Sequence, residues 1–93
     1  YDEIFKKQLA GLISKNDLVI GISTSGKSFN VLNALNFAST ILDKKNIWIW
    51  TGLKSPSYEQ FSSFKVNSSD TPIIQQVHSV LYHLICEKID ALI

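Results

Sequence analysis

Apolar residues in the first half of the chain occur at helical spacing in two segments and as a continuous run between them. Residues 1–14 carry apolar side chains near three- and four-residue steps, which predicts the last part of an amphipathic helix. Residues 18–22 form an unbroken apolar run, typical of a parallel strand that is buried on both faces. After a polar segment at 23–28, helical spacing returns and predicts a second helix to about Asp43.

The second half of the chain repeats this order. Residues 46–51 leave no polar face and predict another buried strand, and residues 52–63, which contain Pro56, predict a loop. Residues 64–66 predict a short edge strand. Thr71 followed by Pro72 is typical of a helix cap and a first helical residue, and one long helix is expected from there to the C-terminus. Helices alternating with strands predict an α/β fold with a parallel sheet, although two or three strands are too few for a complete doubly wound domain.

Composition and charge limit the cellular compartments and the classes of partner that fit this chain. With 93 residues the chain is one domain or part of one. Nine Lys+Arg against eight Asp+Glu leave a net charge of +1, which argues against a nucleic acid or an anionic membrane as partner. No apolar run approaches the roughly 20 residues that span a bilayer. The single cysteine, Cys86, excludes an internal disulfide and fits the cytoplasm. Because the chain has no Met, we expect it to begin inside a longer protein.

The polar segment 23–28 lies between a predicted strand and a predicted helix, where backbone N–H groups and the helix dipole favour an anion. Four hydroxyl side chains and a glycine within six residues exceed what helix capping requires, although capping is the alternative explanation. The segment therefore predicts a site for a phosphate monoester, formed by Ser23, Thr24, Ser25 and Ser28. Residues 21–28 also match the nucleotide P-loop pattern, but the second strand ends in Thr51-Gly52 and not in an acidic residue for Mg²⁺.

The remaining motifs favour a different family. Residues 17–26, DLVIGISTSG, resemble the sugar isomerase (SIS) domain, in particular its phosphoheptose isomerase branch. The resemblance continues through residues 30–35 and the Thr51-Gly52 strand end, and it returns at residues 71–78, TPIIQQVH, with His83 and Cys86-Glu87 after them. Since it covers nearly the whole chain in the right order, it is more specific than the eight-residue P-loop match.

This resemblance implies a parallel-sheet, flavodoxin-like three-layer sandwich, of which residues 1–93 would be the C-terminal part of a single SIS domain. It implies an aldose–ketose isomerase that converts sedoheptulose 7-phosphate to D-glycero-D-manno-heptose 7-phosphate, for lipopolysaccharide or capsule heptose. It also implies a cytoplasmic homotetramer that binds a sugar phosphate and no nucleotide. In the family, the serine turn holds the phosphate, and the functional glutamine and catalytic histidine fall on Gln75 and His83.

The final helix carries two histidines, and histidine suits proton transfer because its pKa lies near the working pH. His78 and His83 are about 140° apart around the helix axis and cannot both face one pocket, whereas Gln75 and His83 are about 80° apart. We therefore expect a structural role for His78. Some family members hold zinc with the same glutamine and histidine, so Gln75 and His83 are candidate zinc ligands, although about 12 Å of helix rise separates them.

Three features qualify the resemblance. Lys27 stands where the family usually has asparagine, and two interpretations stay open: it contacts the phosphate, or it points to solvent. Residues 53–56, LKSP, replace a glycine pair, which leaves the shape of that loop open. The family's general base, a glutamate, falls upstream of Tyr1, so we expect residues 1–93 to be inert by themselves. The alternatives are a non-catalytic SIS module that binds a sugar phosphate or a replication initiator, and a P-loop nucleotide-binding protein.

Overall fold

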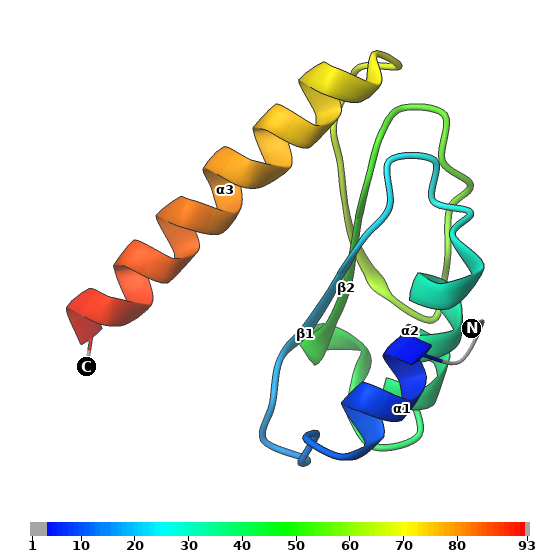
Figure 1. The fold of residues 1–93 in the computed structure, drawn as a ribbon, viewed down its shortest axis with the longest axis vertical. Helices are drawn as coiled ribbons and strands as arrows, with labels where there is room; N and C mark the ends of the chain where they lie inside the picture. Colours follow the sequence, from blue (N-terminus) through cyan, green and yellow to red (C-terminus); the bar gives the residue numbers. More distant parts are fainter. Residues whose placement is uncertain (1–3, 93) are drawn as a thin grey trace.

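The computed structural model describes residues 4–92, with side chains from residue 6 to residue 89. Part of the predicted first helix, residues 1–3, therefore lies outside the described residues. Figure 1 shows the fold. Its elements, in chain order, are α1 (Ile4–Ala10), β1 (Val19–Ile22), α2 (Phe29–Ala38), the 3-10 helix η1 (Lys44–Asn46), β2 (Ile47–Thr51), β3 (Ser62–Lys65) and α3 (Thr71–Leu92).

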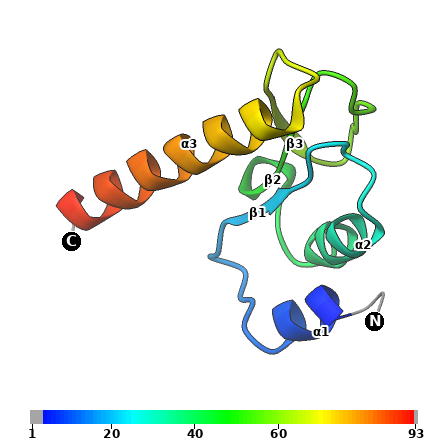
Figure 2. The same cartoon turned by 45° about the horizontal axis from the view of Figure 1, so that its top comes forward.

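The three strands form one parallel sheet in the order β1-β2-β3. Val19 pairs with Ile47 in the first ladder, and Trp48 pairs with Ser62 in the second. Helices α1 and α2 lie on one face of the sheet and α3 lies on the other, as Figure 2 shows. The predicted α/β class with a parallel sheet is confirmed. Helix α2 forms the connection from β1 to β2, a loop connects β2 to β3, and α3 follows β3.

Alternation along β2 assigns its side chains to the two faces of the sheet. Ile47 and Ile49 are almost fully buried in the core beneath α2, where they pack with Leu35 and Phe61. The intervening Trp48 and Trp50 face α3, because successive side chains of a strand point to opposite faces. A strand with apolar residues on both faces is the pattern expected for a central parallel strand.

Helix α2 ends at Ala38, so the predicted extension to about Asp43 is wrong. The hydroxyls of Ser39 and Thr40 donate hydrogen bonds of 2.6 and 2.7 Å to carbonyls three residues before them. Such local bonds offer the backbone an alternative to continued helix. The chain then turns, and Leu42 still reaches the core with 6% of its surface exposed. Its burial explains why the apolar spacing looked helical beyond the real end.

The ends of the other helices and strands differ less from the predicted ones. Helix α1 ends at Ala10, four residues before the predicted end, because glycine follows and weakens the helix. Strand β3 is Ser62–Lys65 and not residues 64–66, so the preceding loop is shorter than predicted. The Ser62 hydroxyl bonds the Lys44 carbonyl at 2.9 Å, and this contact fixes the start of the strand. Helix α3 includes Thr71, which was predicted to be its cap, and the N–H of Ile74 donates to the Asp70 carbonyl.

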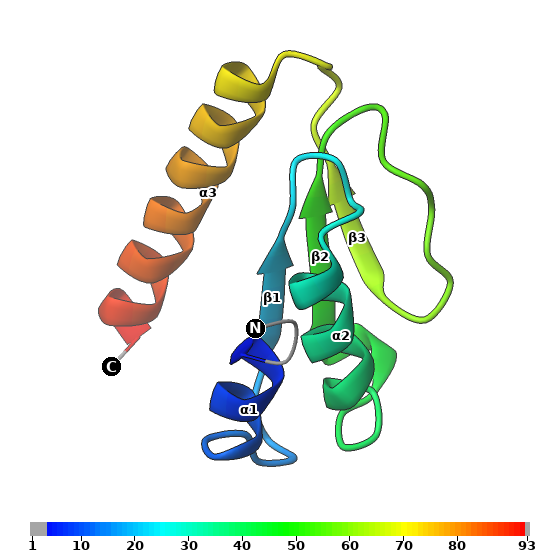
Figure 3. The same cartoon turned by 45° about the vertical axis from the view of Figure 1, so that its right-hand side comes forward.

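Among the described side chains of α3, up to residue 89, those that are fully buried belong to its first turns. Ile74 and His78 are 3% and 2% exposed, whereas Val80 and Leu84 are more than half exposed. Figure 3 shows the helix diverging from the sheet toward its C-terminal end. Among the described residues, no helix is both long enough and apolar enough to cross a membrane.

Candidate phosphate and catalytic site

The serine turn, residues 23–28, lies at the carboxyl end of β1 and leads into α2. It is attached to the neighbouring strand: the Ser23 N–H donates to the Trp50 carbonyl, and the Gly52 N–H donates to the Thr24 carbonyl, both at 2.9 Å. In open parallel sheets, ligands bind outside the carboxyl ends of the strands. The turn therefore occupies the edge of the sheet where a ligand is expected.

Two hydroxyls of the turn are oriented by backbone donors. The Ser23 Oγ accepts the N–H of Ser28 at 3.3 Å, and the Ser25 Oγ accepts the N–H of Lys27 at 3.1 Å. A hydroxyl that accepts one bond still has its own hydrogen to donate. Ser23 and Ser25 are thus held in place with a hydrogen left for a ligand oxygen.

Ser28 is the N-cap residue of α2, but its side chain makes no capping hydrogen bond. The capping explanation therefore does not account for this serine. The first N–H groups of a helix have no partner within it, and they carry the positive end of the helix dipole. Ser28 adds its hydroxyl to this end, while Thr24 is partly buried and Lys27 is exposed beside it.

Gly26 is the buried centre of the turn. Its φ of 69° lies in the left-handed region, and a Cβ atom built on it would stand 1.8 Å from the Ser55 Oγ. Only glycine fits there. The Tyr58 hydroxyl donates to the Gly26 carbonyl, and the Lys65 Nζ donates to the Ser55 carbonyl at 2.8 Å. Sequence reasoning missed this contact between the loop and the turn; the departure from a glycine pair at residues 53–56 was its only signal.

His83 and Gln75 are both exposed on α3. The His83 Nδ1 lies 2.7 Å from the Ser79 carbonyl oxygen. Because a carbonyl only accepts, Nδ1 must carry the proton, and in the neutral ring Nε2 is left with its lone pair free. The ring of Tyr82 meets the imidazole edge to face, with the centroids 5.7 Å apart. The predicted catalytic histidine can therefore take up a proton at Nε2.

His78 is buried between α3 and the end of β2. Its Nε2 lies 3.1 Å from the Thr51 carbonyl oxygen, to which it donates, and its ring is 6.0 Å from the ring of Trp50. Burial lowers the pKa of His78, and the Thr51 carbonyl opposes that shift in part. Among the described residues, its buried Nδ1 has no hydrogen-bond partner. These contacts agree with the structural role expected for this residue.

Gly52 connects the serine turn to the start of α3. A Cβ at Gly52 would lie 2.4 Å from the Cδ1 of Ile74 and 2.9 Å from the Thr24 carbonyl oxygen. Gln75, the next residue, is therefore at the end of α3 nearest the turn, and His83 lies about 12 Å further along the helix. Three apolar grooves lie elsewhere within residues 4–92, and neither the serines of the turn nor His83 belong to their linings.

A zinc ion would need more ligands than Gln75 and His83 offer. Zinc in proteins is usually held by four ligands, and this pair supplies at most two donors. The part of the chain that the structure describes contains no group of three or more His, Cys, Asp and Glu side chains that could hold a metal. The two residues do not form a zinc site by themselves, and the predicted zinc stays a prediction.

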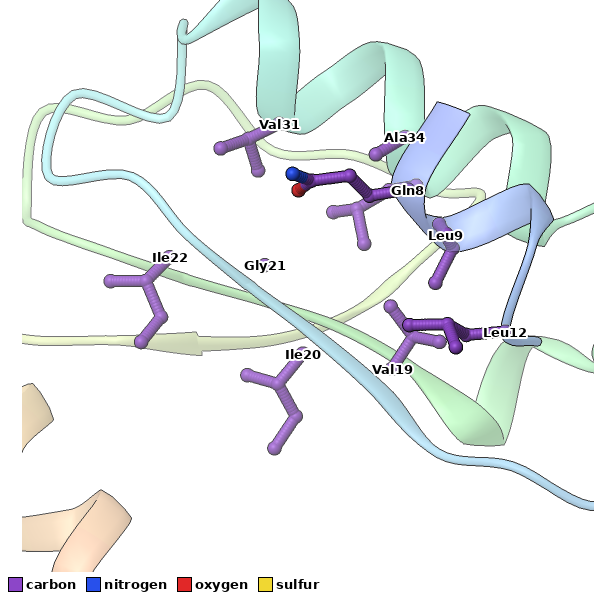
Figure 4. A pocket seen from close by; sticks show the side chains of 10 residues that line it. Gln8, Leu9, Leu12, Val19, Ile20, Gly21, Ile22, Val31 and Ala34 are labelled. Atoms are coloured by element: carbon purple, nitrogen blue, oxygen red, sulfur yellow. The ribbon is translucent and has the colours of Figure 1, made fainter. Parts of the chain in front are cut away.

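An apolar groove of about 470 Å³ lies beside the free edge of β1. Figure 4 shows its lining from α1, β1 and α2, in which the Gln8 amide is the polar group. The lining residues are Gln8, Leu9, Leu12, Val19, Ile20, Gly21, Ile22, Val31, Ala34 and Leu35. Its apolar character does not suit a sugar phosphate, whose hydroxyls and charge need polar partners.

Comparison with known proteins identifies the relatives. No family model matches the chain. It is 45% identical over 92 residues to phosphoheptose isomerase from Aliarcobacter butzleri, a match that covers 97% of this chain and 48% of that protein. The corresponding protein of Thermodesulfovibrio yellowstonii is 42% identical over 100 residues, covering 97% of this chain and 45% of that protein.

A solved structure agrees with the sequence matches. Phosphoheptose isomerase from Neisseria gonorrhoeae superposes with a TM-score of 0.76 and 29% identity, covering 95% of this chain and 50% of that one. The chain thus spans about half the length of the relatives that it matches. The resemblance found in the sequence is confirmed: this chain is a homologue of the phosphoheptose isomerases and has their fold over that half.

Proposed function

We propose that the protein is a phosphoheptose isomerase, which converts sedoheptulose 7-phosphate to D-glycero-D-manno-heptose 7-phosphate. The observation that carries the proposal is the serine turn, in which backbone bonds orient hydroxyls at the carboxyl end of a parallel strand. The similarity to phosphoheptose isomerases over 97% of this chain supports the choice of substrate.

In the proposed reaction the serine turn binds the phosphate. Ser23, Ser25 and Ser28 donate hydroxyl hydrogens to its oxygens, with Thr24 beside them. The first N–H groups of α2 add backbone donors and the positive end of the helix dipole. Binding the phosphate fixes one end of the sugar, so that carbons 1 and 2 are held at a defined distance from it.

The isomerisation moves a hydrogen between C1 and C2 through an enediol. A base removes a proton from C1 and later delivers one to C2, while protons are exchanged at the oxygens of both carbons. We assign the exchange at the oxygens to the Nε2 of His83, which the Ser79 carbonyl leaves unprotonated in the neutral ring. The base that acts on carbon is expected outside residues 1–93, and no step assigned to this chain uses a metal.

The same proposal includes the oligomeric state, the cellular compartment and the pathway that the protein serves. The protein would work in the cytoplasm as a homotetramer and supply heptose for lipopolysaccharide or capsule. Exposed apolar residues on α3 support assembly, because such surfaces mark contacts with other protein. If zinc is bound, Gln75 and His83 would hold it together with ligands from elsewhere. His83 would then bind through Nε2, and zinc would supply a Lewis acid at the sugar oxygens in place of proton exchange at that nitrogen.

Turnover of sedoheptulose 7-phosphate by the natural gene product that contains this chain tests the function. His83→Gln should lower kcat by roughly 10²- to 10⁴-fold, the usual contribution of a general acid–base group. Cys86→Ala, one turn further along α3, is the matched control and should leave kcat unchanged. Full activity in His83→Gln would remove this residue from the mechanism.

Binding measurements separate the alternatives. Binding of sedoheptulose 7-phosphate without turnover would contradict the isomerase and identify a non-catalytic sugar-phosphate module. Tight binding of Mg-ATP in place of the sugar phosphate would favour the P-loop interpretation of residues 21–28.

A further inference from the structure

Residues 53–61, which follow β2, fold back onto the serine turn. The Tyr58 hydroxyl donates to the Gly26 carbonyl, although the two residues are 32 positions apart. The Ser55 Oγ fills the space that a Cβ on Gly26 would need. The loop is itself held in place, because the Lys65 Nζ donates to the Ser55 carbonyl at 2.8 Å.

The ring of Tyr58 is anchored in the hydrophobic core. It packs against the core cluster beneath α2 and lies 5.9 Å, between centroids, from the ring of Phe61. Phe61 is 1% exposed. Close packing leaves such a ring few alternative positions. The Tyr58 hydroxyl therefore reaches the turn from a fixed part of the fold.

The Tyr58 bond acts on one peptide group of the turn. The Gly26 carbonyl and the Lys27 N–H belong to the same peptide unit, which is planar, so fixing the carbonyl fixes the N–H as well. That N–H donates to the Ser25 Oγ at 3.1 Å. Tyr58 thus sets, through one rigid plane, which group faces the Ser25 hydroxyl.

A reversed peptide would remove the Ser25 hydroxyl from the ligand. Rotation of this plane changes ψ of Gly26 and φ of Lys27, and on the Gly26 side the missing Cβ leaves little steric resistance to it. If the plane rotated, the Gly26 carbonyl would face Ser25 in place of the Lys27 N–H. The hydroxyl would then donate its hydrogen to that carbonyl and not to a phosphate oxygen.

We propose that Tyr58 is a positioning residue for phosphate binding: through the Gly26–Lys27 peptide it keeps the Ser25 hydroxyl available as a donor. The proposal rests on the phosphate site proposed above. Tyr58 itself does not contact the sugar phosphate. It acts at the phosphate end of the substrate, so its loss should weaken binding and leave the chemistry at C1 and C2 nearly unchanged.

The test is Tyr58→Phe in the natural gene product, because this change removes the hydroxyl and keeps the ring. KM for sedoheptulose 7-phosphate and the inhibition constant for inorganic phosphate should rise together, roughly three- to tenfold, the size of one net hydrogen bond. The value of kcat should stay within about twofold, as expected when only binding is affected. Unchanged constants for both ligands would overturn the proposal.

Ser62→Ala is the matched control. The Ser62 hydroxyl also donates to a distant backbone carbonyl, that of Lys44 at 2.9 Å, but away from the serine turn. Thermal unfolding should report a similar small loss of stability in both variants, while only Tyr58→Phe changes phosphate affinity. An equal rise of both constants in Ser62→Ala would show a general structural effect and would contradict the proposal.

A phosphate titration separates this proposal from the isomerase. The amide resonance of Lys27, followed by NMR during addition of inorganic phosphate, gives an affinity without any turnover. If phosphate binds in a Tyr58-dependent way and no isomerisation occurs, the isomerase is refuted and the positioning role stands. If the wild-type protein isomerises but its phosphate affinity does not depend on Tyr58, only the positioning role is refuted. Absence of phosphate binding in the wild-type protein refutes both the phosphate site and the role of Tyr58.

Discussion

At the scale of single residues, two buried residues connect separate elements: Gly26 joins the serine turn to the loop after β2, and His78 joins α3 to the end of β2. Gly26 leaves room for Ser55, and His78 donates to the carbonyl of Thr51, the last residue of β2. Gly26 works by the absence of a side chain, which permits its positive φ. The His78 ring fills buried space and donates one hydrogen bond, but its second ring nitrogen, Nδ1, is buried without a partner among the described residues. Both residues therefore hold in place the elements that form the proposed site.

The burial of His78 predicts a pH-dependent stability. Its pKa is lowered by burial, so the unfolded chain takes up the proton first as the pH falls below the ordinary value near 6.5. The free energy of unfolding should be highest above that pH and decrease as the pH falls through the window between 6.5 and the lowered pKa. Below the lowered pKa this contribution should level off. Urea unfolding between pH 8 and pH 5 measures it.

Two variants isolate the contribution of His78. His78→Gln removes the titration and keeps a donor for the Thr51 carbonyl, so its unfolding free energy should lose this part of the pH slope. Val80→Ala is the control, because it changes an exposed residue of the same helix that carries no titratable group, so the slope should persist in it. A slope that persists unchanged in His78→Gln would contradict the assignment.

At the scale of elements, the apolar spacing around α2 does not by itself show which residues belong to the helix or are buried. Its apolar spacing continues beyond Ala38, but hydrogen bonds from Ser39 and Thr40 end the helix. Leu35, within the helix, is 1% exposed, whereas Ile41, beyond its end, is 39% exposed. Residues with the same spacing therefore contribute very different amounts of buried surface.

This difference predicts unequal effects of truncation. Leu35→Ala should lower the free energy of unfolding by about 2–5 kcal/mol, because it leaves a cavity between α2 and the sheet. Ile41→Ala, the control, should change it by about 0.5 kcal/mol or less, as at other exposed positions. Urea denaturation of both variants, with comparable slopes, checks the prediction. Equal losses would mean that Ile41 is buried in solution.

At the scale of the whole molecule, apolar surface remains uncovered on both sides of the sheet. Leu12 is 84% exposed and Phe29 is 64% exposed, and the groove beside the free edge of β1 is almost entirely apolar. A second groove of about 410 Å³ runs between β3 and the exposed side of α3. Because the matched relatives are about twice as long, further protein is available in them to cover such surfaces.

We expect the 93 residues by themselves to bind the dye ANS, which fluoresces on exposed apolar surface. When the chain is joined to the half of the Aliarcobacter butzleri relative that it does not match, emission per molecule should fall by roughly half or more, since the grooves are then covered. Fluorescence titration of the two proteins measures the difference. Equal emission would show that the added half does not pack on these grooves.

Much of this architecture could be predicted from local patterns. The order of helices and strands, the burial of β2 on both faces and the polar turn between β1 and α2 all follow from side chains near in sequence. Such patterns report burial because strands and helices have fixed periods. The donor chemistry of the turn was likewise evident, since hydroxyls and glycine occur there together.

The amino-acid sequence by itself determined the class of fold, the candidate site residues and the resemblance to an isomerase family. Only the tertiary structure decided how α3 diverges from the sheet and that Ser55 and Tyr58 lie against Gly26. The physical reason is that these features depend on residues far apart in the chain meeting in space. Periodicity shows which face of an element is buried, but the geometry of the packed sheet selects the segment that covers it.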